Sequence, residues 1–164
     1  MGAVYVYELE SPTGGDPFVE VAYLKPPFSV VDGAMFGSSV SVSGDGRAFA
    51  VGMPGDACAV YCGVSGQVSL SGALACGTTD VLSGGVFVFA RASIPGADGP
   101  GSGYWTPSVY LREPGLMSGG SGREFRRSVA IDGQSPVFTL AVGVPLPGRV
   151  HVVTLTAGVG DGSE

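Results

Sequence analysis

The chain of 164 residues is poor in the residue types on which most catalytic and binding sites depend. It has no asparagine, one histidine, one lysine and one tryptophan, and only 13% of its residues are charged. Without asparagine there is no acceptor for N-linked glycosylation. The eight basic residues are scattered, apart from Arg123, Arg126 and Arg127, and the net charge is −6. We therefore expect no nucleic-acid partner, because binding phosphates requires a basic face.

Long apolar runs are also missing. None approaches the 18 or so residues of a membrane-spanning helix, so we expect no membrane insertion. The first residues lack the basic and apolar segments of a signal peptide. An apolar fraction of 45% nevertheless excludes a typical disordered chain. The 29 glycines and 12 prolines are about a quarter of the chain, a share that borders on low complexity unless a regular pattern organises them.

Such a pattern exists, and it has a period of two. Val40 and Val42 alternate with serines, which is typical of a half-buried β-strand. Residues 4–7 and 86–89 alternate valine with an aromatic residue, so we expect strands with both faces buried or half-buried. Glycine and proline interrupt nearly every window that could hold an amphipathic helix. The sequence thus predicts an all-β fold.

The predicted strands recur in the same order along the chain. One strand type starts with glycine and continues with alternating valines, at residues 2–7, 84–89 and, more weakly, 148–153. A Phe-x-x-Ser-Val segment at residues 36–40 has a counterpart at 125–129, and an Ala-Val-Gly-x-Pro segment at 50–54 has one at 141–145. Edge-like strands lie between these types, at Val19–Leu24 and Ser108–Leu111.

The recurrence divides the single predicted domain, residues 1–164, into two units of about 2–83 and 84–153. Residues 57–83 form an insertion loop and residues 157–164 a C-terminal tail. Asp45-Gly46 has the chemistry of a tight hairpin turn, and Asp132-Gly133 is expected to start a turn two residues longer in the second unit. Four short strands per unit are typical of β-propeller blades.

These segments resemble the FG-GAP repeat of integrin α heads, in which a Phe-Gly pair is followed by Gly-x-Pro, with a Gly-x-Val-Tyr-Val-Tyr strand between repeats. The matching residues are Phe36, Gly37, Gly52 and Pro54 in the first unit and Phe125, Gly143 and Pro145 in the second. The second unit departs from the pattern at Arg126, which follows Phe125 in place of glycine. The resemblance covers most of the chain outside the insertion.

The resemblance implies a partial β-propeller of two to three four-stranded antiparallel blades. It also implies an extracellular or cell-surface location and a non-enzymatic scaffold for protein–protein or cell-surface recognition and adhesion. Because end blades need cover, we expect further blades in cis or self-association, and favour a piece of a longer protein. Many family members bind calcium, but the turns here offer one carboxylate each, Asp45 and Asp132, so no metal or other cofactor is predicted.

A binding surface is the hypothesis for two groups of side chains. Tyr104 and Trp105 follow a glycine-rich loop, where exposed aromatic rings act as hot spots of recognition, although such a pair more often packs inside a blade. Arg123, Arg126 and Arg127 suit an acidic partner or a sulfated glycan, although a solvated strand edge paired with Glu124 explains them as well.

No arrangement of residues predicts catalysis. His151 takes the place of Tyr5 and Phe87 in the repeated strand, which favours a packed side chain. Among the cysteines, one disulfide, Cys62–Cys76 or Cys58–Cys76, is an alternative to three free thiols. We therefore expect a non-enzyme that binds a protein or a glycan. Two further hypotheses remain open: the accessory propeller of a larger enzyme, for example a hydrolase, and a lectin-like carbohydrate binder.

Overall fold

The computed structural model describes residues 2–9, 17–26, 33–55, 67–69, 84–93, 96, 102–111, 128–144 and 148–156, and the structural statements that follow concern these residues. They form strands and no helix, which confirms the all-β class. The strands are β1 (Val4–Leu9), β2 (Phe18–Leu24), β3 (Ser39–Val42), β4 (Ala48–Met53), β5 (Gln67–Ser69), β6 (Gly85–Ser93), β7 (Gly103–Leu111), β8 (Ser128–Gln134), β9 (Val137–Val144) and β10 (Arg149–Thr156).

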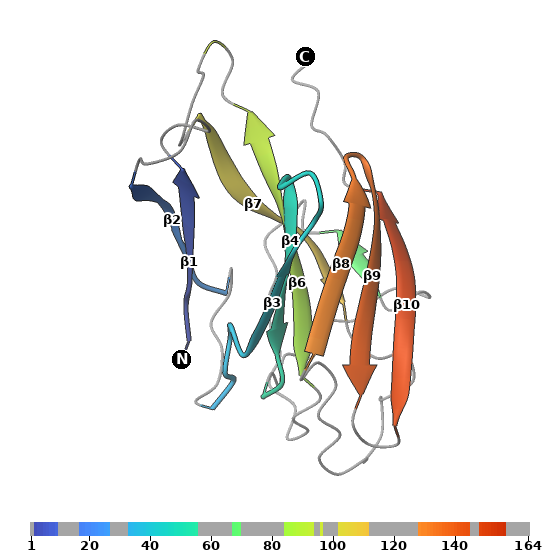
Figure 1. Cartoon of the computed structure of the whole chain (residues 1–164). Helices are drawn as coiled ribbons and strands as arrows, with labels where there is room; N and C mark the ends of the chain where they lie inside the picture. Colours follow the sequence, from blue (N-terminus) through green and yellow to red (C-terminus); the bar gives the residue numbers. More distant parts are fainter. Residues whose placement is uncertain are drawn as a thin grey trace.

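The strands make three antiparallel sheets, none of which closes on itself within the described residues. Sheet I pairs β1 with β2, sheet II has the order β3-β4-β6-β7-β5, and sheet III has the order β10-β9-β8. Figure 1 shows them as three layers, with sheet II between sheet I on the left and sheet III on the right. Sheets I and III pair strands that are consecutive in the chain, whereas in sheet II β5 pairs with β7 at the edge and not between β4 and β6.

The central strands β4 and β6 of sheet II are buried on both faces, and along them small and aromatic side chains alternate. The small aliphatic side chains of sheet II join one core cluster with side chains of sheet III. The members are Ala48, Ala50, Val86, Val88, Val109 and Leu111 on sheet II, and Ile131, Phe138, Leu140, Val142, Val144 and Leu155 on sheet III. Its opposite face carries a second cluster with the aromatic side chains. The members are Ala34, Phe36, Phe49, Val51, Met53, Phe87, Phe89 and Tyr110, and Val4, Val6 and Leu24 of sheet I pack against them.

Sheets II and III repeat each other residue by residue. Gly52 of β4 and Gly143 of β9 each stand opposite a serine of the preceding strand and a valine of the strand that follows in the sheet. The partners are Ser39 and Val86 for Gly52, and Ser128 and Val150 for Gly143. The recurrence of sequence segments between the two units thus corresponds to the same pairing register in sheets II and III.

Sheet I repeats two neighbouring strands of sheet II, β6 and β7, in the same way. Tyr5 pairs with Tyr23 in sheet I, and Phe87 pairs with Tyr110 in sheet II. Both strand pairs also have a register shift at the same place, between residues 6 and 7 in β1 and between residues 88 and 89 in β6. Sheet I therefore corresponds to the last two strands of the four-strand meander β3-β4-β6-β7, and sheet III to its first three.

The sheet boundaries do not follow the sequence units. They fall between β2 and β3 and between β7 and β8, so that sheet II combines the last two strands of the first predicted unit with the first two of the second. The insertion loop 57–83, apart from the three residues of β5, and the tail 157–164 lie outside the described residues.

Three local predictions need correction. In residues 4–7 only the valine side is partly buried, while Tyr5 and Tyr7 are exposed, because sheet I is an outer layer. β3 is a strand with one half-buried face, as predicted, but its serines form that face: Ser41 Oγ accepts a hydrogen bond of 3.1 Å from the amide of Ile131, and the valines are exposed. The Asp132-Gly133 pair lies within β8, which continues to Gln134 before the chain turns.

Candidate recognition surface

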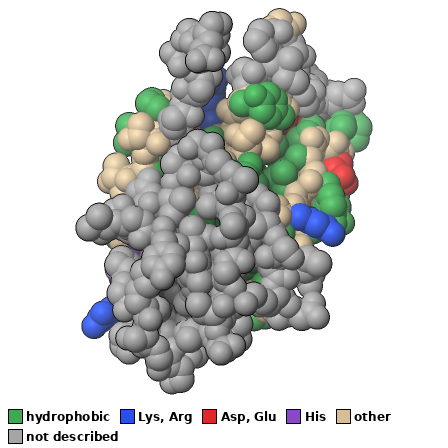
Figure 2. Space-filling view, turned by 180° about the vertical axis from the view of Figure 1, so that it is seen from behind, with side chains coloured by type: hydrophobic (Ala, Val, Ile, Leu, Met, Phe, Trp, Pro, Cys, Tyr) green, Lys and Arg blue, Asp and Glu red, His purple; other side chains and the backbone are tan. Residues whose placement is uncertain are grey.

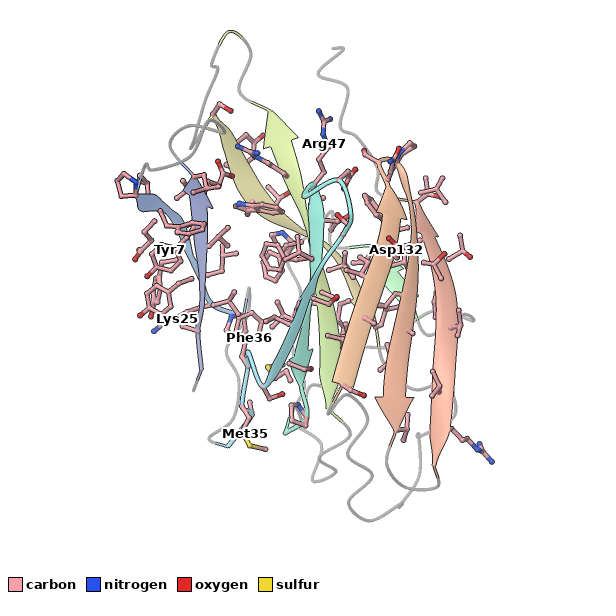
Figure 3. All side chains as sticks on the ribbon, viewed as in Figure 1. Tyr7, Lys25, Met35, Phe36, Arg47 and Asp132 are labelled. Atoms are coloured by element: carbon pink, nitrogen blue, oxygen red, sulfur yellow. The ribbon has the colours of Figure 1, made fainter. Side chains whose placement is uncertain are left out.

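The outer face of sheet I is a row of exposed aromatic and aliphatic side chains, which we call the tyrosine face. Its members are Tyr5, Tyr7 and Leu9 on β1 and Phe18 and Tyr23 on β2. They share one face because side chains alternate along a strand and paired residues point the same way. Figure 3 shows Tyr7 pointing away from the other sheets, on the same side as Lys25.

The tyrosines are held in place by neighbours on the same face. The rings of Tyr5 and Tyr23 lie 4.9 Å apart between centroids and are tilted by 48°. The phenol of Tyr7 donates a hydrogen bond of 3.3 Å to Glu20 Oε2, and Lys25 Nζ lies 5.5 Å from the centroid of the Tyr23 ring. Partial desolvation, followed by the negative charge and hydrogen bond of Glu20, raises the pKa of Tyr7, so this phenol stays neutral at physiological pH.

This face is large for a surface exposed to solvent. The exposed fractions are 54% for Tyr5, 53% for Tyr7, 68% for Phe18 and 49% for Tyr23. Since an aromatic side chain covers about 150–250 Å² when fully buried, these four offer on the order of 400 Å². An area of about 400 Å² is in the range of the largest apolar patch on a typical monomer, about 300–600 Å², and such patches are often functional. Figure 2 shows, from behind, hydrophobic side chains at the side where β1 and β2 lie, next to basic and acidic groups.

The two aromatic residues predicted to bind lie on opposite faces of β7. Tyr104 is exposed, opposite Ala92. Trp105 is half-buried in the second core cluster, where its ring lies 4.7 Å from that of Phe49. Trp105 thus packs sheet II, and the structure does not bring the pair together on one surface.

Several other predicted residues lie outside the described part of the chain. They are Arg123, Arg126 and Arg127 of the basic cluster, Cys58, Cys62 and Cys76, and the motif residues Phe125 and Pro145. The hypotheses attached to them stay predictions. His151 is described and half-buried on β10, opposite Val142, in the position that the repeat predicted.

The Phe-Gly and Gly-x-Pro segments of the first unit meet in space. The amide of Gly37 donates a hydrogen bond of 3.1 Å to the carbonyl of Gly52, and Phe36 lies buried 5.8 Å from Phe87, edge to face. Gly37 has φ 89°, and a Cβ on it would lie 3.0 Å from the carbonyl oxygen of Ala3. Its conformation and its neighbours therefore both require glycine.

The turn carboxylate of Asp45 joins two hairpins. Its Oδ1 accepts hydrogen bonds from the Ser43 hydroxyl at 2.7 Å and from the Arg47 amide at 3.0 Å, and its Oδ2 accepts one of 2.7 Å from the amide of Ser135 beyond β8. Partial desolvation raises the pKa of Asp45, but these hydrogen bonds and the charge of Arg47 outweigh it and lower the pKa below its usual value. The described residues contain no group of three or more side chains suited to hold a metal ion.

Sequence reasoning missed the tyrosine face. The alternation of residues 4–7 places the tyrosines on one side, but it cannot tell whether another sheet covers that side. In comparisons with known proteins, no family model matches the chain and no curated protein is similar to it in sequence. No helix in the described ranges has the length and apolar character needed to cross a membrane.

Proposed function

We propose that the chain is a non-enzymatic repeat scaffold for protein–protein or cell-surface recognition, and that the tyrosine face is a contact surface of this scaffold. The observation that carries the proposal is the exposure of Tyr5, Tyr7, Phe18 and Tyr23 on one face of sheet I. Tyrosine suits such a role because it offers a large, stiff contact area at low entropic cost while its hydroxyl stays hydrated.

As its architecture we propose a partial β-propeller of the FG-GAP type. Two observations support this. The meander β3-β4-β6-β7 has the four antiparallel strands of a blade, and its register recurs in part in sheets I and III. The hydrogen bond between Gly37 and Gly52 joins the two segments on which the resemblance rests. By the same resemblance we propose an extracellular or cell-surface location.

Three acidic side chains have structural roles, which supports the non-enzymatic part of the proposal. Asp45 joins two hairpins, and Glu8 pairs with Arg91 across sheets I and II at 3.0 Å. Glu20 accepts the hydrogen bond of Tyr7. Each of these carboxylates holds strands together or orients the tyrosine face.

A lectin-like carbohydrate binder is the second candidate, because sugars also stack on exposed aromatic rings. The tyrosine face favours it, whereas Trp105, the aromatic residue first expected in that role, packs against Phe49. Weaker binding of a tyrosine-face variant does not distinguish the two candidates, so the test must also show whether the ligand is a protein or a glycan.

Binding to cells of the organism that encodes the chain tests both candidates. The fluorescent chain is presented on streptavidin, as wild type and as the double variant Tyr5→Thr/Tyr7→Thr. We expect saturable binding that the variant weakens at least tenfold and that protease treatment of the cells abolishes. Loss after glycosidase treatment alone would favour the lectin. Binding that is absent, or equal for the two proteins, would contradict a recognition role for the tyrosine face.

A further inference from the structure

We propose that the tyrosine face of one chain packs on the outer face of sheet III of a second copy, head to tail. This inference rests on the proposed function and names a partner for the same surface. The outer face of sheet III, called here the valine face, consists of Val150, Val152, Ala130, Ala141 and Gly143.

The contact between sheets I and II within one molecule shows how the proposed contact between two molecules would pack. There, Phe87 and Phe89 of β6 are fully buried, and Val4 and Val6 of β1 pack against their cluster. Valine on the facing sheet leaves room for the aromatic ring, so that large and small side chains interlock across the two layers.

The tyrosine face occupies the positions of the buried aromatic face. Tyr5 and Phe87 are each the second residue before the register shift of their strand, so they correspond to each other. Tyr7 and Phe89 correspond because each is the first residue after the shift. Phe87 is 0% exposed and Tyr5 is 54% exposed. The same side of the repeat is therefore covered in sheet II and open in sheet I.

The valine face likewise occupies the positions of a buried face. Val150 and Val152 correspond to Val86 and Val88, and they stand opposite Gly143 and Ala141 as Val86 and Val88 stand opposite Gly52 and Ala50. Val86 and Val88 are 0% and 2% exposed, whereas Val150 and Val152 are 68% and 67% exposed. Val150 and Val152 also correspond to Val4 and Val6, on which the aromatic rings pack within the molecule.

The two open faces therefore complement each other as the internal layers do. If Tyr5 and Tyr7 of a second copy lie over Val150 and Val152, sheet I of that copy stacks on sheet III of the first. The sheets of the two molecules then follow one another in the order I, II, III, I, II, III. A symmetric dimer would instead join the tyrosine face to another tyrosine face or the valine face to another valine face, whereas both internal contacts join opposite faces of the repeat. Contacts between unlike faces generate rings or open chains of molecules.

Complementation between two variants tests the direction of the contact. Tyr5→Thr/Tyr7→Thr removes one face and Val150→Lys/Val152→Lys the other. Val40→Lys/Val42→Lys is the matched control, since these valines of β3 are also exposed on an edge strand but belong to neither face. Thermal unfolding checks each variant, and Val150→Thr/Val152→Thr replaces the lysine variant if it does not fold.

Sedimentation velocity measures the masses. We expect the wild type and the control to exceed the single-chain mass of 16.4 kDa and to grow with concentration, and each face variant to stay at 16.4 kDa. An equimolar mixture of the two face variants should form a complex of two chains, because each supplies the face that the other lacks.

The inference is overturned if the wild type stays a single chain up to a concentration of about 0.5 mM, because any association would then have a Kd in the millimolar range or weaker. It is also overturned if the mixture of the face variants does not associate. If the single chain still binds cells through Tyr5 and Tyr7, the inference alone fails and the proposed function stands. If neither association nor cell binding occurs, both fail.

Discussion

Tyr5 and Phe87 occupy the same position in two sheets of the molecule, yet Tyr5 is exposed and Phe87 is buried. Each pairs with a tyrosine, Tyr23 and Tyr110, and each pair of rings lies 4.8 to 4.9 Å apart. The difference lies in what covers them. Sheet I covers Phe87, whereas no described element covers Tyr5.

Truncating the two residues should therefore have unequal effects on folding. Phe87→Ala leaves a cavity in the second core cluster and should lower the free energy of unfolding by about 3–5 kcal/mol. Tyr5→Ala should lower it by less than about 1.5 kcal/mol, because Tyr5 is already 54% exposed and its described ring contact is with Tyr23. Urea unfolding at low protein concentration measures both, and equal losses would contradict the layer order.

Two glycines that flank β3 should respond differently to replacement by alanine. Gly37→Ala should destabilise the fold by about 1–3 kcal/mol, because φ 89° is strained for alanine and the new Cβ meets the Ala3 carbonyl. Gly44→Ala, where the nearest contact is an ordinary 3.5 Å to Asp132 Oδ1, should be neutral or stabilise by up to about 1 kcal/mol. Thermal unfolding of both variants checks the ranking, which a tolerated Gly37→Ala would refute.

The Asp45 carboxylate should make stability depend on pH. Its pKa is lower in the folded than in the unfolded chain, so its contribution is complete above the unfolded pKa of about 3.9 and is lost as the pH falls through the folded pKa. Asp45→Asn should lower the melting temperature at pH 7, and the difference from wild type should shrink steadily below about pH 4. A difference that stays constant from pH 7 to pH 2 would show that the charge plays no part.

The ion pair between Glu8 and Arg91 should couple sheet I to sheet II. Its atoms lie 3.0 Å apart, and the side chains are 20% and 26% exposed. A double-mutant cycle with Glu8→Gln and Arg91→Gln should give a coupling free energy of about 0.5–1 kcal/mol that declines in high salt. Hydrogen exchange of the β1 amides should accelerate in both single variants, and unchanged exchange would argue against the pair as a link between the sheets.

The sequence predicted the strand class and the recurrence, because period-two alternation and glycine placement are local signals. Residues 4–7 and 86–89 were both recognised as strands and form β1 and β6. Burial could not be predicted in the same way. Nearly the same four-residue pattern is covered on both faces in β6 and on one face in β1, since burial depends on which sheet lies alongside.

The turns show the same limit on a smaller scale. Asp45-Gly46 forms the predicted hairpin turn, with Gly46 at φ 66°. Asp132-Gly133 has the same two residues, yet it pairs within β8 opposite Thr139 and Phe138. The residue types permit a turn at both places, but in β8 the pairing continues past Asp132 and Gly133 to Gln134, opposite Val137.

Photocrosslinking from position 5 tests the head-to-tail association of repeated sheets most directly. A benzoylphenylalanine in place of Tyr5 keeps an aromatic ring on the tyrosine face, and a mixture of ¹⁵N-labelled and unlabelled chains identifies links between molecules. We predict crosslinks between labelled and unlabelled chains that join position 5 to residues 137–144 or 149–156, the strands of the valine face. Crosslinks to β1 or β2 of the second molecule, or no crosslinks between molecules, would contradict the head-to-tail association.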